Sequence, residues 1–317
     1  MTRAFRDAAL YLCVTTPYEA VRASLEKLLG SAPCSESLRR AVLEEGGVVL
    51  QVQAREREQV LSGEVAAPKV RRPKRLHVSV DGGYVRKRER GRWHEAKCGS
   101  IFSERVAQLS KGRRWRADRH YLGTFERAEQ FGEQLYTAAF ARGVEEAEQV
   151  VVLGDGAGWI RSLKEYHFPE AELRLDFWHV CRAVHRGLRA VYERDDPRLQ
   201  RRYEACMDLI AAGQARQAVG RLRQICARAA QGRETLTETI EYLQHNLDIM
   251  PAYARLQAEG EVISSAAAEQ TVEQLVNARF KGHHRQWRTD CGEALMALRC
   301  LRLNHTWEDY WIQRKAA

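Results

Sequence analysis

Apolar residues recur at helical spacing through the first 62 residues of the chain. They mark one face of a helix over Tyr18–Leu29, and Gly30 follows as a stop signal. Ser35 then begins a second helical pattern, whose outward face carries Arg39 and Arg40. The two helices predict an αα-hairpin with the length of a helix-turn-helix, so these arginines are candidates for contacts with DNA. The alternative is a hairpin that serves packing alone.

Strand patterns follow residues 63–75, where glycine and proline alternate with basic side chains. That stretch predicts either a solvated hinge or a basic arm against a nucleic-acid backbone. From residue 76 to residue 179, β-branched runs alternate with amphipathic helical segments. The expected strands are Leu76–Asp81, Trp93–Phe102, His120–Phe125, Val150–Asp155 and Glu172–Phe177, and the expected helices are Glu126–Arg142 and Gly158–Tyr166. The order βββαβαβ is typical of an α/β protein with a ribonuclease-H-like mixed sheet.

Helical patterns continue from residue 180 to residue 262. Because this stretch is too long for an ordinary connection, it predicts a large all-α insertion. Residues 263–317 then return to the core with a helix over Ala266–Phe280, a basic segment Lys281–Arg288 and a helix over Gly292–Asn304. The expected organisation is a helical region at 1–62, a linker at 63–75, core segments at 76–179 and 263–317, and the insertion at 180–262.

Three acidic residues are the candidate catalytic and metal-binding residues of the chain. Asp81 and Asp155 each end an expected strand with glycine directly behind, and Glu269 lies on an expected helix. Carboxylate oxygens suit Mg²⁺ or Mn²⁺. Two such ions about 4 Å apart activate the attacking oxygen and stabilise the leaving oxygen of a phosphodiester. We therefore expect the three carboxylates to lie within about 8 Å of one another, as two-metal geometry requires.

The charge balance fits a polyanionic partner. Of 317 residues, 51 are Lys or Arg and 42 are Asp or Glu, which gives a net charge of +9. Arginine far outnumbers lysine, and guanidinium groups match phosphate oxygens. The codon bias of a GC-rich genome produces the same composition, so charge alone leaves both readings open.

The eight cysteines form no Cys-x-x-Cys pair, which excludes zinc-ribbon spacing. There is no signal-peptide pattern, and no apolar run approaches the roughly 18 residues that span a bilayer. We therefore expect free thiols, a cytoplasmic protein associated with the nucleoid, and no membrane partner.

Several segments resemble a known family. They are Val80-Asp81-Gly82, Gly154-Asp155-Gly156-Ala157-Gly158-Trp159-Ile160 and Leu175-Asp176-Phe177-Trp178-His179, together with Glu269 followed by Arg279-Phe280-Lys281 and Gln286-Trp287. These segments are similar to the DDE transposases of bacterial insertion sequences, especially the Kra-type and Lre-type groups within the wider Mutator-like set. The resemblance covers roughly residues 5–310.

The resemblance implies a ribonuclease-H-like catalytic domain with a helical insertion before the glutamate. It also implies Mg²⁺-dependent strand cleavage and strand transfer at the terminal inverted repeats of the protein's own element. Asp81, Asp155 and Glu269 become the catalytic residues and the ligands of two Mg²⁺ or Mn²⁺ ions, with Glu273 competing for the third role. Double-stranded DNA, both element ends and target, is the implied partner, bound by a homodimer.

The resemblance also assigns auxiliary residues. Asp176 and His179 match a pair that lies beside the active site in this superfamily, where it acts in catalysis or DNA positioning or fixes the strand end. Arg279 and Lys281 are expected phosphate contacts, although a helix-surface ion pair gives the same pattern. Trp287 either packs in the core or stacks on an unpaired base.

The chain also departs from the family pattern. Family members commonly carry a cysteine-rich, zinc-ribbon-like region upstream of the matched part. In this sequence, Met1 already lies inside the matched part. Ser264–Ala268 stands where the family has glycine and serine before the glutamate. Three hypotheses follow: an active transposase, a truncated or repurposed DNA-binding protein, or another ribonuclease-H-like nuclease. The acidic triad favours the first and third, and the insertion with the Asp-x-x-His pair favours the first.

Overall fold

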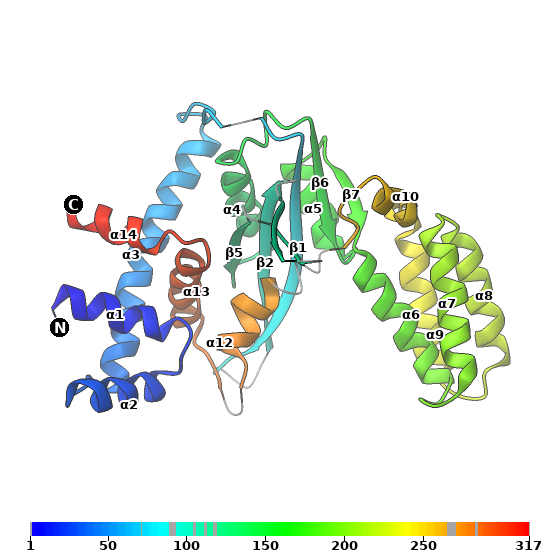
Figure 1. Cartoon of the computed structure of the whole chain (residues 1–317), viewed down its shortest axis with the longest axis horizontal. Helices are drawn as coiled ribbons and strands as arrows, with labels where there is room; N and C mark the ends of the chain where they lie inside the picture. Colours follow the sequence, from blue (N-terminus) through cyan, green and yellow to red (C-terminus); the bar gives the residue numbers. More distant parts are fainter. Residues whose placement is uncertain are drawn as a thin grey trace. The chain divides into compact units, whose positions relative to one another are not determined.

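The computed structural model describes the chain apart from residues 1, 71, 89–92, 104–105, 111–112, 117–118, 265–270, 283–284 and 317. The protein is mixed α/β, with a five-stranded sheet in the order β5-β2-β1-β6-β7 (Figure 1). Its strands are β1 (Arg75–Arg86), β2 (Trp93–Ser103), β5 (His120–Thr124), β6 (Gln149–Gly154) and β7 (Glu172–Leu175). Antiparallel pairs join β1 to β2 and β2 to β5, whereas β6 and β7 are parallel. The mixed α/β class predicted from the sequence is confirmed.

The chain divides into two compact units. Unit 1 comprises Met1–Val150, Glu165–Glu170 and Ala267–Ala317, and unit 2 comprises Val151–Lys164 and Ala171–Ala266. Each unit has its own hydrophobic cluster.

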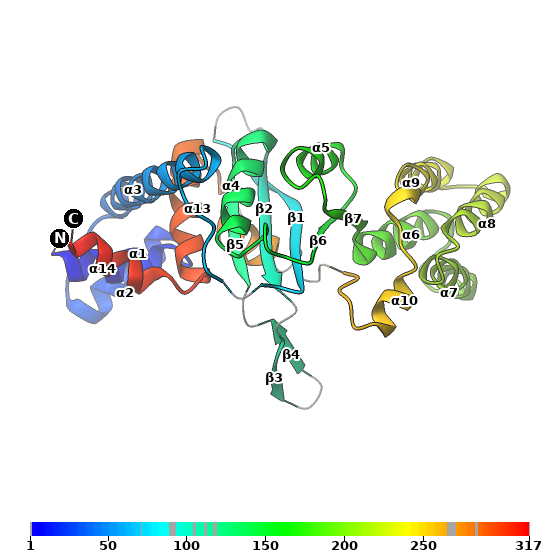
Figure 2. The ribbon, with the colours of Figure 1, turned by 90° about the horizontal axis from the view of Figure 1, so that it is seen from above.

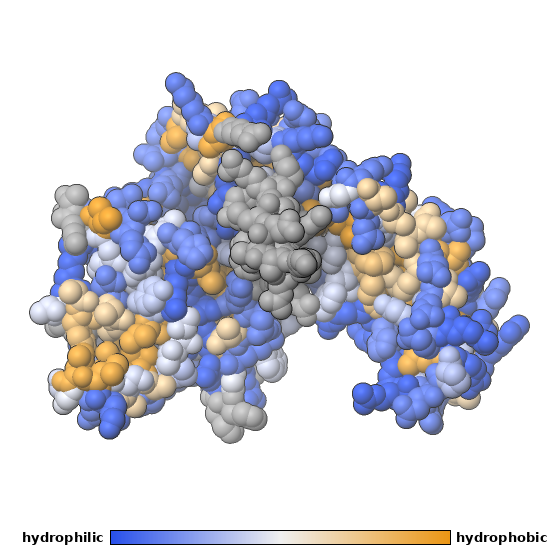
Figure 3. Space-filling view, in the orientation of Figure 1, coloured by the Kyte–Doolittle hydropathy of each residue, from blue (hydrophilic) through white to orange (hydrophobic). Residues whose placement is uncertain are grey.

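The two ends of the chain build the helical part of unit 1. Its helices are α1 (Arg3–Cys13), α2 (Tyr18–Leu29), α3 (Ser35–Leu61), α13 (Thr289–Leu303) and α14 (Trp307–Ala316). Gly46 of α3 lies so close to α13 that a Cβ there would approach the carbonyl oxygen of Ala294 to 2.3 Å. The predicted α2 and α3 are confirmed, and Gly30 ends α2 with a φ of 73°. Figure 3 shows apolar surface over α2, where Leu28 and Leu29 are exposed.

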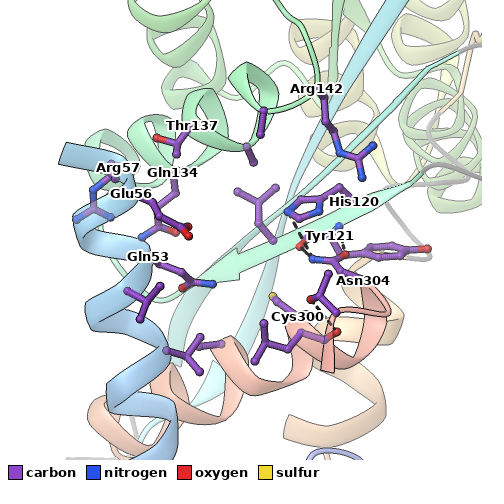
Figure 4. A pocket seen from close by; sticks show the side chains of 18 of the residues that line it. Gln53, Glu56, Arg57, His120, Tyr121, Gln134, Thr137, Arg142, Cys300 and Asn304 are labelled. Carbon is purple, nitrogen blue, oxygen red and sulfur yellow. Dashed lines mark hydrogen bonds between the residues drawn. The ribbon is translucent and has the colours of Figure 1, made fainter. Parts of the chain in front are cut away.

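Side chains of α13 and the turn behind it cover the free edge of β5. Asn304 accepts a hydrogen bond from the Tyr121 amide at 2.7 Å and donates one to the Tyr121 carbonyl at 2.8 Å (Figure 4). Glu293 accepts hydrogen bonds from the Thr124 hydroxyl and the Phe125 amide. Covering an edge in this way removes a template for pairing with another chain.

Several elements of unit 1 differ from the sequence prediction. A hairpin of β3 (Val106–Ser110) and β4 (Arg113–Arg116) follows β2 in the sequence and precedes β5. It projects from the sheet (Figure 2). Helix α4 (Ala128–Phe140) is shorter at both ends than predicted. The expected helix over Ala266–Phe280 is described from residue 271, where it contains a π-helical turn, η2 (Glu273–Asn277), followed by α12 (Ala278–Phe280).

Unit 2 contains the helical stretch that the sequence predicted between residues 180 and 262. Its elements are α6 (Phe177–Val191), α7 (Pro197–Ala211), α8 (Ala215–Arg228), α9 (Arg233–His245), η1 (Leu247–Ile249) and α10 (Tyr253–Ala258), and α5 (Gly158–His167) begins in this unit. Pro197 occupies the first turn of α7 behind the capping side chain of Asp196, as expected for a helix start. No helix within the described residues is long and apolar enough to span a membrane.

Candidate active site

Asp81 lies in the interior of β1, opposite Cys98 of β2. The prediction that the strand ends at Asp81 is wrong, because the β1 ladder continues through Gly82 and Gly83 to Arg86. A Cβ on Gly83 would lie 3.0 Å from a methyl group of Val272, so glycine permits close packing here instead of a turn. The half-buried Asp81 carboxylate accepts a hydrogen bond from the Gly82 amide at 2.7 Å.

Asp155 follows β6 directly, as the sequence predicted. Its Oδ1 accepts a hydrogen bond from the Ala157 amide at 2.9 Å, and its carbonyl accepts one from the Tyr242 hydroxyl at 2.9 Å. Gly156 has a φ of 85°, and a Cβ there would lie 2.2 Å from Oδ1 of Asn246. Because Tyr242 and Asn246 come from the helical insertion, the insertion fixes the loop that carries Asp155.

Asp176 is fully buried and caps helix α6. Its Oδ1 accepts hydrogen bonds from the Trp178 amide at 2.8 Å and from the Ser264 hydroxyl at 3.1 Å. The predicted strand over Glu172–Phe177 ends early, because Asp176 starts the helix instead. This position favours a structural role for Asp176, which fixes the start of α6. His179, on the first turn of α6, is the member of the pair that faces open space.

That open space is a cleft of about 690 Å³ in unit 2. Its lining includes one carboxylate, two histidines and two arginines. The lining residues are Asp155, His179, Cys181, Arg182, Ala183, His185, Arg186, Tyr203 and Tyr242. Burial raises the pKa of the Tyr242 phenol, so this group stays protonated and remains a hydrogen-bond donor. The cleft therefore combines a carboxylate with several side chains that can donate hydrogen bonds.

The third predicted ligand, Glu269, lies outside the described residues. Its competitor Glu273 is exposed on η2 and accepts a hydrogen bond from Asn277 at 2.7 Å. Asp81 and Glu273 belong to unit 1, and Asp155 belongs to unit 2. Among the residues that the structure describes, no three His, Cys, Asp or Glu side chains form a metal-binding group. Convergence of the three carboxylates therefore stays a prediction, although the oxygen donors of Asp81 and Asp155 fit Mg²⁺ or Mn²⁺.

Two of the predicted DNA contacts pack within unit 1, where Arg279 is buried and Trp287 is half-buried. Arg279 is 2% exposed, its Nε donates to the Cys13 carbonyl at 2.9 Å, and its guanidinium lies over the rings of Tyr18 and Trp287 at 5.0 and 4.9 Å. Burial lowers the pKa of Arg279. The indole of Trp287 donates to the Phe280 carbonyl at 3.0 Å. This geometry favours packing roles over the phosphate contact and base stacking expected from the sequence.

The other predicted DNA contacts lie nearer the surface. Arg39 is engaged within unit 1, where it pairs with Glu36 and donates to the Cys291 sulfur at 3.0 Å. The Arg40 side chain is 69% exposed, and Lys281 is also exposed. Arg40 and Lys281 therefore remain the accessible members of the predicted set.

A larger cavity of about 1020 Å³ lies in unit 1 between α3, α4, β5 and α13 (Figure 4). Many of its wall residues are aliphatic, and His120 lies among them. Burial and the nearby charge of Arg142 lower the pKa of His120 to about 4, so its imidazole is neutral near pH 7. None of the described candidate carboxylates Asp81, Asp155 and Glu273 lines this cavity. It is therefore distinct from the candidate active site.

The sequence reading missed most of the residues around Asp155. Tyr242 and Asn246 follow Asp155 by about ninety positions and lie in a helical segment with no motif. Arg182 and Arg186 did leave a signal, because they fall at i+3 and i+7 from His179 on one helical face. The helical spacing of His179, Arg182 and Arg186, combined with the predicted Asp155 loop, would have indicated the cleft.

A family model matches nearly the whole chain. The model of an uncharacterised protein family, UPF0236, matches residues 1–314. A search of curated proteins found no match. Since the matched region covers nearly the whole chain, both units and the insertion lie within it. The chain belongs to the UPF0236 family.

Proposed function

We propose that this protein is a DDE-type transposase, which cleaves and rejoins DNA phosphodiester bonds with Mg²⁺ or Mn²⁺ held by Asp81, Asp155 and Glu269. The observation that supports this most is the Asp155 loop. It presents a carboxylate at the end of β6 beside a cleft that carries two arginines and two histidines. A metal-binding acid next to cationic donors suits a phosphodiester substrate. The similarity of the sequence segments to DDE transposases supports the same reaction.

The reaction consists of two substitutions at phosphorus. Water attacks a phosphodiester at the element end, the 3′ oxygen leaves, and a 3′-hydroxyl and a 5′-phosphate result. The 3′-hydroxyl then attacks a phosphodiester of the target, so one P–O bond forms as another breaks. Bound divalent ions would activate the attacking oxygen and stabilise the leaving oxygen. Contacts with Tyr242 and the conformation of Gly156 hold the Asp155 loop, and His179 lines the same cleft, which supports this role.

The proposed partner is double-stranded DNA, both the terminal inverted repeats and the target. Two element ends must be cut for one insertion, so a homodimer on DNA and a location at the nucleoid belong to the proposal. The net charge of +9 supports a polyanionic partner.

The test is cleavage of a duplex that contains the sequences flanking the gene, measured with Mg²⁺, with Mn²⁺ and with chelator. Asp155→Asn should abolish cleavage and retain duplex binding, because it removes a charge and hardly changes shape. Asp208→Asn, the same change at an exposed position of α7, is the matched control and should cleave normally. Metal-independent cleavage, or normal cleavage by Asp155→Asn, would refute the proposal. Binding without any cleavage by the wild type would indicate a DNA-binding protein that retains the fold.

A further inference from the structure

Helix α6 has one apolar and one cationic face. Val180, Val184 and Leu188 are fully buried in the cluster of unit 2. On another face, Arg182 and Arg186 are exposed and stand four residues apart, so their side chains are neighbours on the helix surface. Both line the cleft that Asp155 also lines.

The cleft is held in place by contacts within unit 2. The Thr239 hydroxyl of α9 donates to the Ala183 carbonyl of α6 at 3.2 Å, and a Cβ on Gly187 would lie 2.6 Å from the Thr239 hydroxyl oxygen. Tyr242, also on α9, donates to the Asp155 carbonyl at 2.9 Å. Helix α9 thus contacts both α6 and the Asp155 loop. These contacts fix the position of the two arginines relative to the Asp155 loop.

The two guanidinium groups are available to a ligand. The Arg182 guanidinium lies 4.4 Å from the ring centre of Trp178, and this stacking orients the group while its N–H donors stay at its edge. Arg186 lies 4.0 Å from Glu238, and both side chains are more than half exposed, so this ion pair is weak. A ligand with several anionic oxygens would replace that pair with stronger charge-assisted hydrogen bonds.

We propose that this cleft binds the phosphodiester backbone of a nucleic-acid strand, with Arg182 and Arg186 holding a phosphate beside the Asp155 loop. That the bound strand is the one being cleaved rests on the proposed transposase function. The backbone contact itself does not. The two arginines are then positioning residues, which act by holding the strand and take no part in proton transfer.

The test compares two double variants that lose the same charge. Arg182→Ala/Arg186→Ala removes the cleft pair, and Arg189→Ala/Arg194→Ala removes two exposed arginines outside the cleft lining. Binding of a fluorescent single strand, the matching duplex and inorganic phosphate is measured in chelator over a range of salt. The cleft variant should bind the preferred nucleic acid about tenfold or more weakly. Its slope of log K against log salt should fall by about 1.4 for a single strand or 1.8 for a duplex. Circular dichroism checks that both variants fold.

The outcomes separate this inference from the proposed function. A cleft variant that binds like the control variant would overturn the phosphate contact, even where wild-type protein cleaves DNA. A loss specific to the cleft variant would support it, even where no cleavage occurs. Equal losses in both variants would indicate general charge attraction and would also overturn it. Displacement of both nucleic acids by millimolar inorganic phosphate would identify a site for free phosphate, which contradicts a strand-binding role.

Discussion

At the residue scale, Gly156 determines the conformation of the Asp155 loop. Its φ of 85° is strained for any other residue, and a Cβ would lie 2.2 Å from Asn246. Gly156→Ala should therefore lower the free energy of unfolding by about 1–3 kcal/mol. The matched control is Gly158→Ala, where a Cβ meets no atom within 4 Å, and its effect should stay below about 1 kcal/mol. Urea unfolding of both variants checks this, and equal effects would contradict the role given to Gly156.

Glu293 gives a prediction about pH. Burial raises the pKa of this carboxyl from 4.5 to about 7. Because the folded state holds the proton more tightly than the unfolded state, the free energy of unfolding falls as pH rises from about 4.5 to about 7. Glu293→Gln retains an oxygen that accepts the bonds from Thr124 and Phe125. It should raise the free energy of unfolding by about 1–3 kcal/mol at pH 8 and by less at pH 5. Urea unfolding measures both values, and an equal difference at the two pH values would disprove the assignment.

Arg279 gives a prediction that separates structure from DNA contact. Its guanidinium is buried and bonded to the Cys13 carbonyl, so Arg279→Ala should lower the free energy of unfolding by about 1.5–3 kcal/mol. Arg40→Ala, at a side chain 69% exposed, should change it by less than about 0.5 kcal/mol. The folded Arg279→Ala protein should keep the wild-type salt dependence of DNA binding. A slope reduced by about 1 would show a phosphate contact at Arg279 after all.

At the element scale, side chains of α13 and of the turn behind it make the hydrogen bonds to β5 that a neighbouring strand would otherwise make. Asn304 bonds both the amide and the carbonyl of Tyr121. Asn304→Ala should expose these groups, lower the free energy of unfolding by about 1–3 kcal/mol and speed hydrogen exchange at the Tyr121 amide. Gln313→Ala, which removes an exposed amide on α14, is the control. Unchanged exchange at Tyr121 in Asn304→Ala would contradict the edge-capping role.

Most helices and strands could be predicted from the sequence, and a few could not. Helices α2 and α3 follow from apolar spacing and from Gly30, and β6 follows from its run of valines. Strands β2 and β5 were also expected close to their observed positions. The β3–β4 hairpin was missed because its strands, Val106–Ser110 and Arg113–Arg116, are short and the second is mostly arginine. Helix α14 was missed because its apolar residues are interspersed with charges over a short span.

The site was predictable only where it depends on local sequence. Asp155 at a strand end followed from the run before it. Its contacts with Tyr242 and Asn246 did not, because tertiary packing brings those residues together from about ninety positions away. The burial of Arg279 was likewise invisible, since its hydrogen-bond partner Cys13 lies 266 positions earlier.

At the scale of the whole molecule, the proposed chemistry uses residues of both units. Asp81 comes from unit 1 and Asp155 from unit 2, while the helical insertion fixes the Asp155 loop within unit 2. The helical insertion therefore has a local task that does not depend on DNA. It determines the conformation of one candidate metal ligand and forms the cleft beside it.

The central claim is that Asp81, Asp155 and Glu269 act together on one phosphodiester. The most direct measurement is Mg²⁺-dependent cleavage of flanking-sequence duplex by Glu269→Gln and by Glu273→Gln, with duplex binding measured in chelator. The two glutamates lie four residues apart in the sequence, so the variants are matched in chemistry. The account predicts that Glu269→Gln binds DNA but loses cleavage by at least about a thousandfold, as Asp81→Asn and Asp155→Asn do, while Glu273→Gln cleaves at close to the wild-type rate. Normal cleavage by Glu269→Gln, or loss in Glu273→Gln alone, would contradict it.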